Sequence, residues 1–430
     1  MRLGSPAATA ESAPIGAPSE SPGEPPRIAP ATCGALQARR YHPRAMITKR
    51  GRLWLTRGIA LLVMSVFVVL VASTWFYSGR IEFQLLRVIP PGGDRDEVVV
   101  ATDGVTVTLP LDARTGRQGR WGLSFDGGYA ELGDLLSSGG GVVVWQILRS
   151  TGALAPGTAV SFDRMAFAGD PATRVALEEV LLSGPLGDYP AWLGGGTDDT
   201  WVIFVHDRGA DRSEALRLLP TVAALGLPSL TVTYRNDAEA PPSAGGHVGM
   251  GRDEWEDLDA AVSYAVAEGA SDVVLVGYGV GGSIVEVFIH DSRQAGRVSG
   301  IVLDAPLLDA GGEAARLAAG DKVPGFIVGW AKAVATLRYG VDWGELDHLA
   351  AAPLTSVPTL IIHGADDPLY PVAVSEAFAD AAPHLVTVLV VPGAGHGESW
   401  NVDSSSYERA VSSFLVEVAG VPVSLPTSGG

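Results

Sequence analysis

The sequence predicts an α/β fold: a mostly parallel, doubly wound sheet preceded by an apolar helix and a small β-rich module. Three observations carry this prediction. From about residue 175, apolar runs of strand length alternate with segments of helical periodicity. Residues 273–276 form an apolar, valine-rich run, followed at once by a glycine-rich turn and a helical segment. Residues 58–77 are an uncharged stretch long enough to cross a bilayer.

The N-terminal part divides by composition. Residues 1–45 are rich in Pro, Ala, Ser and Gly and show no period, which predicts a disordered tail. Met46 opens a more regular stretch and is an alternative start of the chain. Residues 46–57 form a basic juxtamembrane segment, and residues 58–78 are predicted to be a transmembrane helix that binds the chain to the membrane.

Basic residues precede the span, so the positive-inside rule predicts a single-pass protein of the cell membrane. Its N-terminus would be cytoplasmic and its C-terminal domain extracytoplasmic. A cleaved signal peptide is the alternative, but the span is long for one and ends in the bulky residues Trp75, Phe76 and Tyr77. A buried soluble helix is a further alternative, disfavoured because nothing polar interrupts the run.

The charge is distributed unevenly. Residues 1–57 hold nine basic and three acidic residues, whereas the rest of the chain holds 21 basic and 45 acidic residues. So acidic a domain argues against nucleic acid as a partner, because phosphates would be repelled. The single cysteine, Cys33, excludes an internal disulfide.

The remaining chain is predicted to contain two folded parts. Residues 81–172 form a β-rich module with short strands at 97–100, 105–109 and 142–145, and no catalytic pattern. Residues 175–420 form the α/β domain, with a helical cap at about 310–355, and residues 421–430 are a flexible tail. Strands of the domain are expected at 176–182, 188–193, 201–205, 229–234, 273–276, 300–304, 358–362 and 386–391. Helices are expected at 211–225, 253–268, 283–292, 372–382 and 405–418.

Four segments fall at the ends of predicted strands, where ligands bind in open α/β sheets. They are residues 205–209, 277–282, 363–371 and 392–397. The second has the Gly-x-Ser-x-Gly spacing of a nucleophile elbow, with glycine at the central position, 279. With an acid and a histidine following in chain order, the sequence resembles the α/β-hydrolases. More narrowly, segments 233–237, 303–306 and 399–403 resemble membrane-anchored bacterial hydrolases of the serine-aminopeptidase-like (S33-like) group.

This resemblance implies an ester- or peptide-hydrolase site. Asp367 matches the acid, with Asp366 as its neighbouring candidate, His396 matches the base, and Gly279 stands at the nucleophile position. The backbone N–H groups of Val280 and Arg208 match the oxyanion donors. Two other histidines, His206 and His363, are expected to support loops.

Two departures fall on the reaction centre. Gly279 removes the nucleophile, and Asp207 replaces the glycine expected in the oxyanion loop, where an inward carboxylate would oppose a developing oxyanion. Ser283 lies one helical turn beyond the elbow and is expected to be structural. Loss of a triad nucleophile costs on the order of 10⁶ in rate. Efficient acyl-enzyme chemistry is therefore not expected.

Three functions remain open. The first is a pseudohydrolase that binds a partner or a small acyl or peptide-like ligand, without cofactor or metal. The second is an active esterase or peptidase that uses His396 and Asp367 by an unorthodox route, such as activated water. The third is a dinucleotide-binding domain, because Gly277, Gly279 and Gly282 fit Gly-x-Gly-x-x-Gly and Asp304 follows some 25 residues on.

Overall fold

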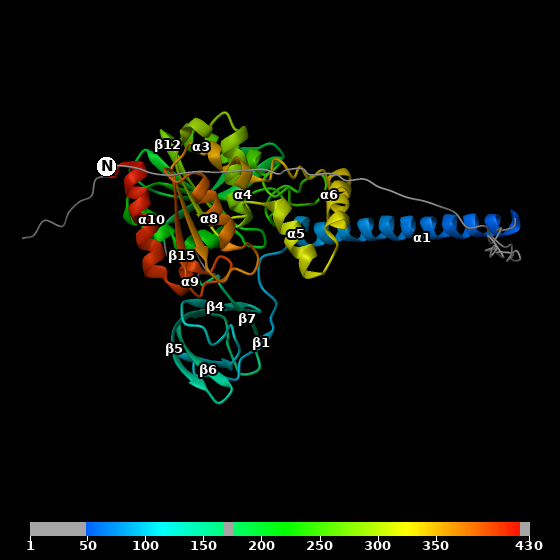
Figure 1. Ribbon diagram of the computed structural model, residues 1–430. Coiled ribbons are helices and arrows are strands. Elements are labelled where there is room, and N and C mark those ends of the chain that lie inside the picture. Colours follow the sequence, from blue (N-terminus) through cyan, green and yellow to red (C-terminus); the bar gives the residue numbers. More distant parts are fainter. Residues whose placement is uncertain (1–48, 167–174, 422–430) are drawn as a thin grey trace, which may run out of the picture. The chain divides into compact units, whose positions relative to one another are not determined.

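The computed structural model of the 430-residue chain describes residues 49–166 and 175–421 (Figure 1). The predicted tail 1–45, residues 46–48 of the basic segment, residues 167–172 of the predicted module and residues 422–430 lie outside the described residues. The chain divides into two units, Met1–Leu62 and Val63–Gly430. Of the first unit only residues 49–62, the start of a helix, are described, and the elements after that helix belong to the second.

The predicted membrane span lies within one helix, α1 (Lys49–Ile81), which continues into a short π-helical segment, η1 (Glu82–Leu86). The helix is long and apolar enough to cross a membrane, by length and composition. Its far end has another role, because Ile81, Leu85 and Leu86 are buried in the core of the α/β domain. The end of this helix and the segment after it are therefore part of the domain's packing and are not a free linker.

The β-rich module is a seven-stranded antiparallel sheet in the order β1-β7-β4-β5-β6-β3-β2. Its strands are β1 (Glu97–Val98), β2 (Ala101–Thr102), β3 (Thr106–Pro110), β4 (Trp121–Phe125), β5 (Gly128–Gly139), β6 (Val142–Thr151) and β7 (Ala159–Asp163). The prediction of three short strands was incomplete. The end of β5 is rich in Ser and Gly and resembles a loop, but Gly140 and Gly141 supply the two positive φ angles of a tight hairpin.

The α/β domain is built on an eight-stranded sheet in the order β15-β14-β13-β12-β10-β11-β9-β8. Its strands are β8 (Leu177–Gly184), β9 (Gly187–Gly194), β10 (Thr200–Val205), β11 (Ser229–Val232), β12 (Asp272–Tyr278), β13 (Val298–Asp304), β14 (Thr359–Gly364) and β15 (Val386–Val391). The first two form an antiparallel hairpin, and the strands from β10 to β15 are parallel. This arrangement confirms the predicted fold class, the α/β-hydrolase fold.

Both faces of the sheet are covered, as continuous apolar strands require. In β12, Val273 and Leu275 pack into one core, and Val274 and Val276 into the other, following the two-residue period of a strand. The helices on the first face are α3 (Trp255–Ala267), α4 (Val280–Asp291) and α8 (Val372–Ala381). The helices on the second face are α2 (Leu219–Ala224), α9 (Ser399–Val402) and α10 (Ser404–Ala419) (Figure 1).

Two predicted helix boundaries were wrong for local reasons. The segment predicted as one helix at 211–225 is a 3-10 helix, η3 (Arg212–Arg217), followed by α2, because Pro220 cannot continue a helix that begins before it. Helix α4 begins at Val280 and not at residue 283. Its glycines suggest a turn, yet they are helical and allow close packing: a Cβ on Gly281 would lie 2.3 Å from the carbonyl oxygen of Val205.

Short helices fill the long connection between β13 and β14, where a cap was expected. They are α5 (Ala310–Gly320), α6 (Gly325–Tyr339), α7 (His348–Ala351) and η5 (Ala352–Leu354), and a further turn, η4 (Ala295–Arg297), precedes β13.

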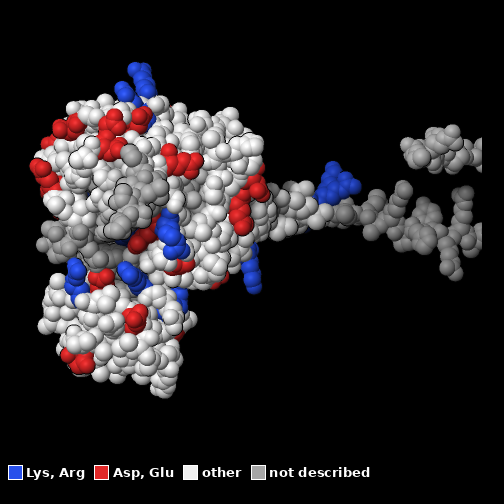
Figure 2. Space-filling model, turned by 90° about the vertical axis from the view of Figure 1, so that its left-hand side faces the viewer, with Lys and Arg blue, Asp and Glu red and all other residues white. Residues whose placement is uncertain are grey.

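On the face drawn in Figure 2, acidic side chains of the described residues form several separate patches. That distribution agrees with the acidic composition of the chain after residue 57.

Candidate functional site

The elbow of the site is the junction of β12 and α4. Gly279 lies there at φ 51° and ψ −112°, a conformation that glycine adopts freely but that would strain a residue with a side chain. Its N–H donates to the carbonyl of Asp304, and its own carbonyl accepts from the N–H of Leu307. The elbow is therefore intact as a backbone structure. A Cβ on Gly279 would lie 2.0 Å from Oδ1 of Asp207, so a serine cannot be added without moving that carboxylate.

The Asp207 carboxylate occupies the centre of the site. Its Oδ1 accepts the backbone N–H groups of Val280 at 2.8 Å and Arg208 at 2.7 Å. These are the two donors predicted to stabilise an oxyanion. Its Oδ2 lies 3.0 Å from Nε2 of His396 and accepts from the Arg164 guanidinium at 3.2 Å. The residue is 5% exposed. One side chain thus fills both the predicted oxyanion hole and the place where a nucleophile would face the histidine.

The structure brings the predicted acid and base together at the ends of β14 and β15. Nδ1 of His396 lies 2.8 Å from Oδ2 of Asp367. The other oxygen of Asp367 accepts from the backbone N–H groups of Leu369 and Tyr370, which fixes the carboxylate. Asp366, the neighbouring candidate, is exposed, and its side chain has no hydrogen bond within the described residues. The geometry therefore favours Asp367 as the partner of His396.

The protonation states of His396 and Asp207 are set by their burial and by the charged groups that they contact. Burial alone lowers the pKa of His396, but the hydrogen bonds that its ring donates to Asp207 and Asp367 outweigh burial and raise that pKa to about 9. Burial alone raises the pKa of Asp207, but His396 and Arg164 hold it well below its usual range. His396 is therefore an imidazolium at neutral pH, held between two carboxylates. A general base must be neutral, so the resting site is not ready to accept a proton.

Arg164 reaches the site from the end of the β-rich module, just after β7. Besides Asp207, it pairs with Glu214 at 2.9 Å and donates to the carbonyl of His396 at 3.1 Å. Glu214 is buried, pairs with Arg217 at 2.9 Å, and accepts the backbone N–H of Asp207 at 2.8 Å. Sequence reasoning missed this arginine, because nothing in the pattern around it distinguishes it from a surface residue. The module thus contributes a charge to the candidate site.

The other predicted residues are structural in this geometry. His206 contacts Asp237 at 2.8 Å, and His363 contacts the hydroxyl of Ser375 at 2.8 Å, so both tie loops together. The Ser283 hydroxyl is fully buried and lies 2.7 Å from Nε2 of His348, a histidine that the sequence did not single out. Burial lowers the pKa of His348 to about 3. Ser283 is therefore closed off from any substrate.

The groups that a dinucleotide would need are already bonded to other parts of the chain. The N–H of Val280 at the start of α4, which a pyrophosphate would need, is bonded to Asp207. Asp304, the candidate ribose acid, is fully buried and accepts from the hydroxyl of Tyr407 at 2.9 Å. Among residues 49–166 and 175–421, no group of three or more His, Cys, Asp or Glu side chains is placed to hold a metal ion.

Comparisons with known proteins match different parts of the chain. A family described as a domain of unknown function (DUF8805) matches residues 98–163, the β-rich module. No curated protein matches the sequence. An esterase from Pyrococcus furiosus is similar in structure, with 18% identity, a TM-score of 0.45, and coverage of 57% of this chain and 94% of that one.

Two further solved structures are similar over a comparable share of the chain. An esterase from Thermogutta terrifontis has 20% identity and a TM-score of 0.42, and the match covers 56% of this chain and 99% of that one. A protein from Xanthomonas campestris, described as an α/β serine hydrolase without lid, has 13% identity and a TM-score of 0.42, with 58% and 97% covered.

Proposed function

We propose that this chain is a membrane-anchored pseudohydrolase: an α/β-hydrolase-fold protein that acts by binding a ligand or a partner and not by acyl transfer. The observation that carries the proposal is the position of Asp207. Its carboxylate accepts from both oxyanion donors, Val280 at 2.8 Å and Arg208 at 2.7 Å, and contacts His396 at 3.0 Å. A substrate carbonyl oxygen would need the same two donors.

Acyl transfer needs three things that this site withholds. It needs a nucleophile, and Gly279 offers none. It needs an empty oxyanion hole, and Asp207 fills it. It needs a neutral histidine, but the ring of His396 is charged at neutral pH. Burial lowers its pKa, yet Asp207 and Asp367 outweigh burial and raise that pKa to about 9. The same charge argues against the alternative of water activated by His396 and Asp367, because a protonated imidazole cannot take a proton from water.

The membrane part of the proposal rests on α1. Lys49, Arg50, Arg52 and Arg57 precede its apolar stretch, which favours a cytoplasmic N-terminus and an extracytoplasmic domain. Added protease should then digest the domain in intact spheroplasts. Digestion only after lysis would contradict this orientation.

A cavity of about 190 Å³ beside the oxyanion loop is the candidate ligand site. Its lining includes Ile89, Pro90, Arg208, Asn236 and Asp237. It has room for about six waters, which suits a short acyl or peptide-like group with a carboxylate facing Arg208. Titration calorimetry with short-chain fatty acids should give binding that Arg208→Gln weakens. Equal heats for the native chain and the Arg208→Gln variant would argue against this site.

The proposal is tested by rebuilding the nucleophile. The full chain in detergent is used, because Ile81 and Leu85 belong to the domain core and a truncation there would damage it. Gly279→Ser alone should not react with a serine-directed fluorophosphonate, since its Cβ meets Asp207. Gly279→Ser with Asp207→Gly should react, and adding His396→Ala should abolish the reaction. Ser283→Ala in the same background is the matched control and should leave labelling unchanged.

Ester turnover gives the complementary measurement. The native chain should hydrolyse p-nitrophenyl esters no faster than its His396→Ala variant. Turnover that depends on His396 would falsify the proposal and favour the unorthodox hydrolase. Absence of labelling in a folded double variant, with folding checked by its melting temperature, would count against Gly279 as the nucleophile position.

A further inference from the structure

Helix α6 of the cap has apolar side chains on two opposite faces. Val328, Ala331 and Ala335 are buried against the domain. On the other side Phe326, Trp330 and Leu337 are 59%, 68% and 86% exposed. With Ala333, which is also exposed, these three are spaced at four, three and four residues and form one stripe along the helix. We call this stripe the outer face of α6.

The outer face continues the apolar surface of α1. Side chains of the two helices line one cavity of about 340 Å³, among them Phe67, Leu70 and Trp75 of α1 and Phe326, Trp330 and Val334 of α6. In Figure 1, α6 runs crosswise to α1 next to the end that enters the domain. A helix that crosses a membrane-spanning helix in this way would lie in the plane of the membrane, as interfacial amphipathic helices do.

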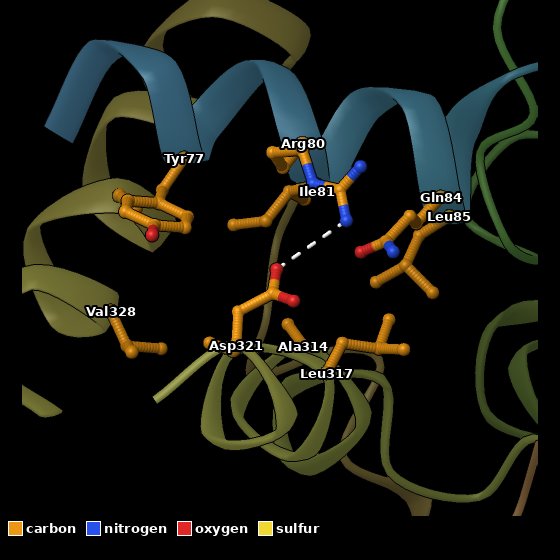
Figure 3. Close-up of a pocket in the computed structure, with 11 residues that line it drawn as sticks. Tyr77, Arg80, Ile81, Gln84, Leu85, Ala314, Leu317, Asp321 and Val328 are labelled. Atoms are coloured by element: carbon orange, nitrogen blue, oxygen red, sulfur yellow. Dashed lines mark hydrogen bonds and ion pairs between the residues drawn. The ribbon is translucent and has the colours of Figure 1, made fainter. Parts of the chain in front are cut away.

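Polar contacts mark where this apolar level ends. Arg338, near the end of α6, stacks over the ring of Trp75 at 4.0 Å and donates to the hydroxyl of Ser78 at 2.7 Å. Arg80 pairs with Asp321 at 3.4 Å, at the end of α5, as Figure 3 shows. Arginine side chains at such a level can direct their charges toward headgroups while their stems stay apolar.

The depth of α6 can be worked from α1. The predicted span ends near Tyr77, and a helix rises about 1.5 Å per residue. The α1 residues that share the cavity, Phe67 to Trp75, therefore lie roughly 3–15 Å inside the end of the span. Interfacial helices bury their apolar face roughly 5–10 Å into the boundary of headgroups and acyl chains. The depth worked from α1 therefore includes the depth at which interfacial helices bury their apolar face.

We infer that α6 is a second membrane contact, with its outer face against the acyl chains of the leaflet nearest the α/β domain. The inference rests on the proposed role of α1 as an anchor and goes beyond it, because α1 alone would leave the domain free to tilt. With α6 also seated, the cap is held against the bilayer. A lipid surface is favoured over a second protein because the face continues that of α1, which lipid already surrounds if α1 spans the membrane.

The test is a spin-label depth measurement on the full chain in phosphatidylcholine–phosphatidylglycerol liposomes. Cys33→Ser provides the background, and Ala333→Cys places the label on the outer face while keeping Phe326 and Trp330. Leu337→Cys is a second position on the same face. Val63→Cys in α1 reports the anchor, and Leu136→Cys on β5, which is 54% exposed, is the water-facing control. Power saturation compares collisions with oxygen, which enters lipid, and with a water-soluble nickel complex.

The label at 333 should collide with oxygen more than with nickel, like the label at 63 and unlike the label at 136. The label at 337, on the same face, should also collide with oxygen more than with nickel. If the label at 63 is shielded from nickel while the labels at 333 and 337 are as accessible to nickel as the label at 136, the inference fails and the anchor stands. If the labels at 333, 337 and 63 all resemble the label at 136, the anchor itself fails. Protection of 333 from both reagents, with spin–spin broadening that disappears on dilution with unlabelled chain, would mean a second copy covers the face and would overturn the lipid contact.

Discussion

Replacing Asp207 by asparagine removes one charge from the centre of the site with almost no change in shape. Asn can still accept the N–H groups of Val280 and Arg208 through its carbonyl oxygen. Its amide nitrogen, however, would face the His396 ring and the Arg164 guanidinium, which are themselves donors. The variant therefore keeps the oxyanion contacts and loses the ion pair with His396.

The size of the effect follows from the pKa of His396. Burial opposes its charge, yet Asp207 and Asp367 raise that pKa from 6.5 to about 9, which corresponds to about 3 kcal/mol of folding free energy. Because Asp367 keeps part of this contribution, Asp207→Asn should cost about 2 kcal/mol through His396. For a domain of this size that lowers the melting temperature by roughly 4–8 °C.

The pH dependence identifies the cause. The pKa of His396 is raised, so its contribution is complete below pH 6.5 and is lost as the pH rises through about 9. The pKa of Asp207 is lowered, against the effect of burial, so its contribution is present above its ordinary value of 3.8 and is lost as the pH falls toward its depressed value. The difference in stability between native chain and variant should therefore be largest between about pH 5 and 6.5 and should shrink by about 2 kcal/mol by pH 9.5.

The assay is thermal denaturation of the full chain in detergent, followed by tryptophan fluorescence at several pH values. Asp366→Asn is the matched control, because it removes an exposed acid one residue away from Asp367 and should shift the melting temperature little at any pH. His206 also has a pKa raised to about 9, where the charge of Asp237 outweighs burial, but it is present in both proteins and cancels. A difference between native chain and Asp207→Asn that stays constant from pH 5 to 9.5 would refute the ion pair.

Two further predictions concern residues that join parts of the chain. Arg164→Met should destabilise the domain by about 3 kcal/mol, because it leaves the buried carboxylates of Asp207 and Glu214 with one partner fewer each; a melting temperature unchanged from the native chain would show that this arginine is not needed. Leu86→Ala, at a side chain 2% exposed, should cost roughly 2–5 kcal/mol, whereas Leu354→Ala, at a side chain 72% exposed, should cost less than about 0.5 kcal/mol in the same melting experiment. Equal shifts for the two leucine variants would mean that the segment after α1 does not belong to the core.

The sequence predicted the framework well because strong local signals specify it. Strand β12 is a run of apolar residues ended by glycines, and the sequence expectation for 273–276 lies inside the observed Asp272–Tyr278. The order of elbow, acid and histidine also fixed which strand ends would meet. The contact of His396 with Asp367 at 2.8 Å follows from neighbouring parallel strands, β14 and β15, whose ends lie side by side.

What the sequence could not predict depends on side-chain direction and on distant contacts. An aspartate at 207 was expected to oppose an oxyanion if it pointed inward, but nothing in the sequence said that it would take the oxyanion's place. Arg164 was invisible because it lies 43 residues from Asp207 in a module without a catalytic pattern. The outer face of α6 was also missed, because an apolar helix in a cap normally indicates burial on every side.

The two departures at the reaction centre depend on each other. A serine at 279 would place its Cβ 2.0 Å from Asp207, so the carboxylate tolerates only glycine there. Without Asp207, in turn, His396, Arg164 and the N–H group of Val280 would lose a shared acceptor. The result is a negative oxygen in the oxyanion hole beside a protonated histidine, the charge distribution that a hydrolase forms only during turnover. Because these groups are already satisfied internally, the proposed pseudohydrolase role predicts that their stabilisation is not available to a reacting substrate, and that acyl transfer would require both positions to change together.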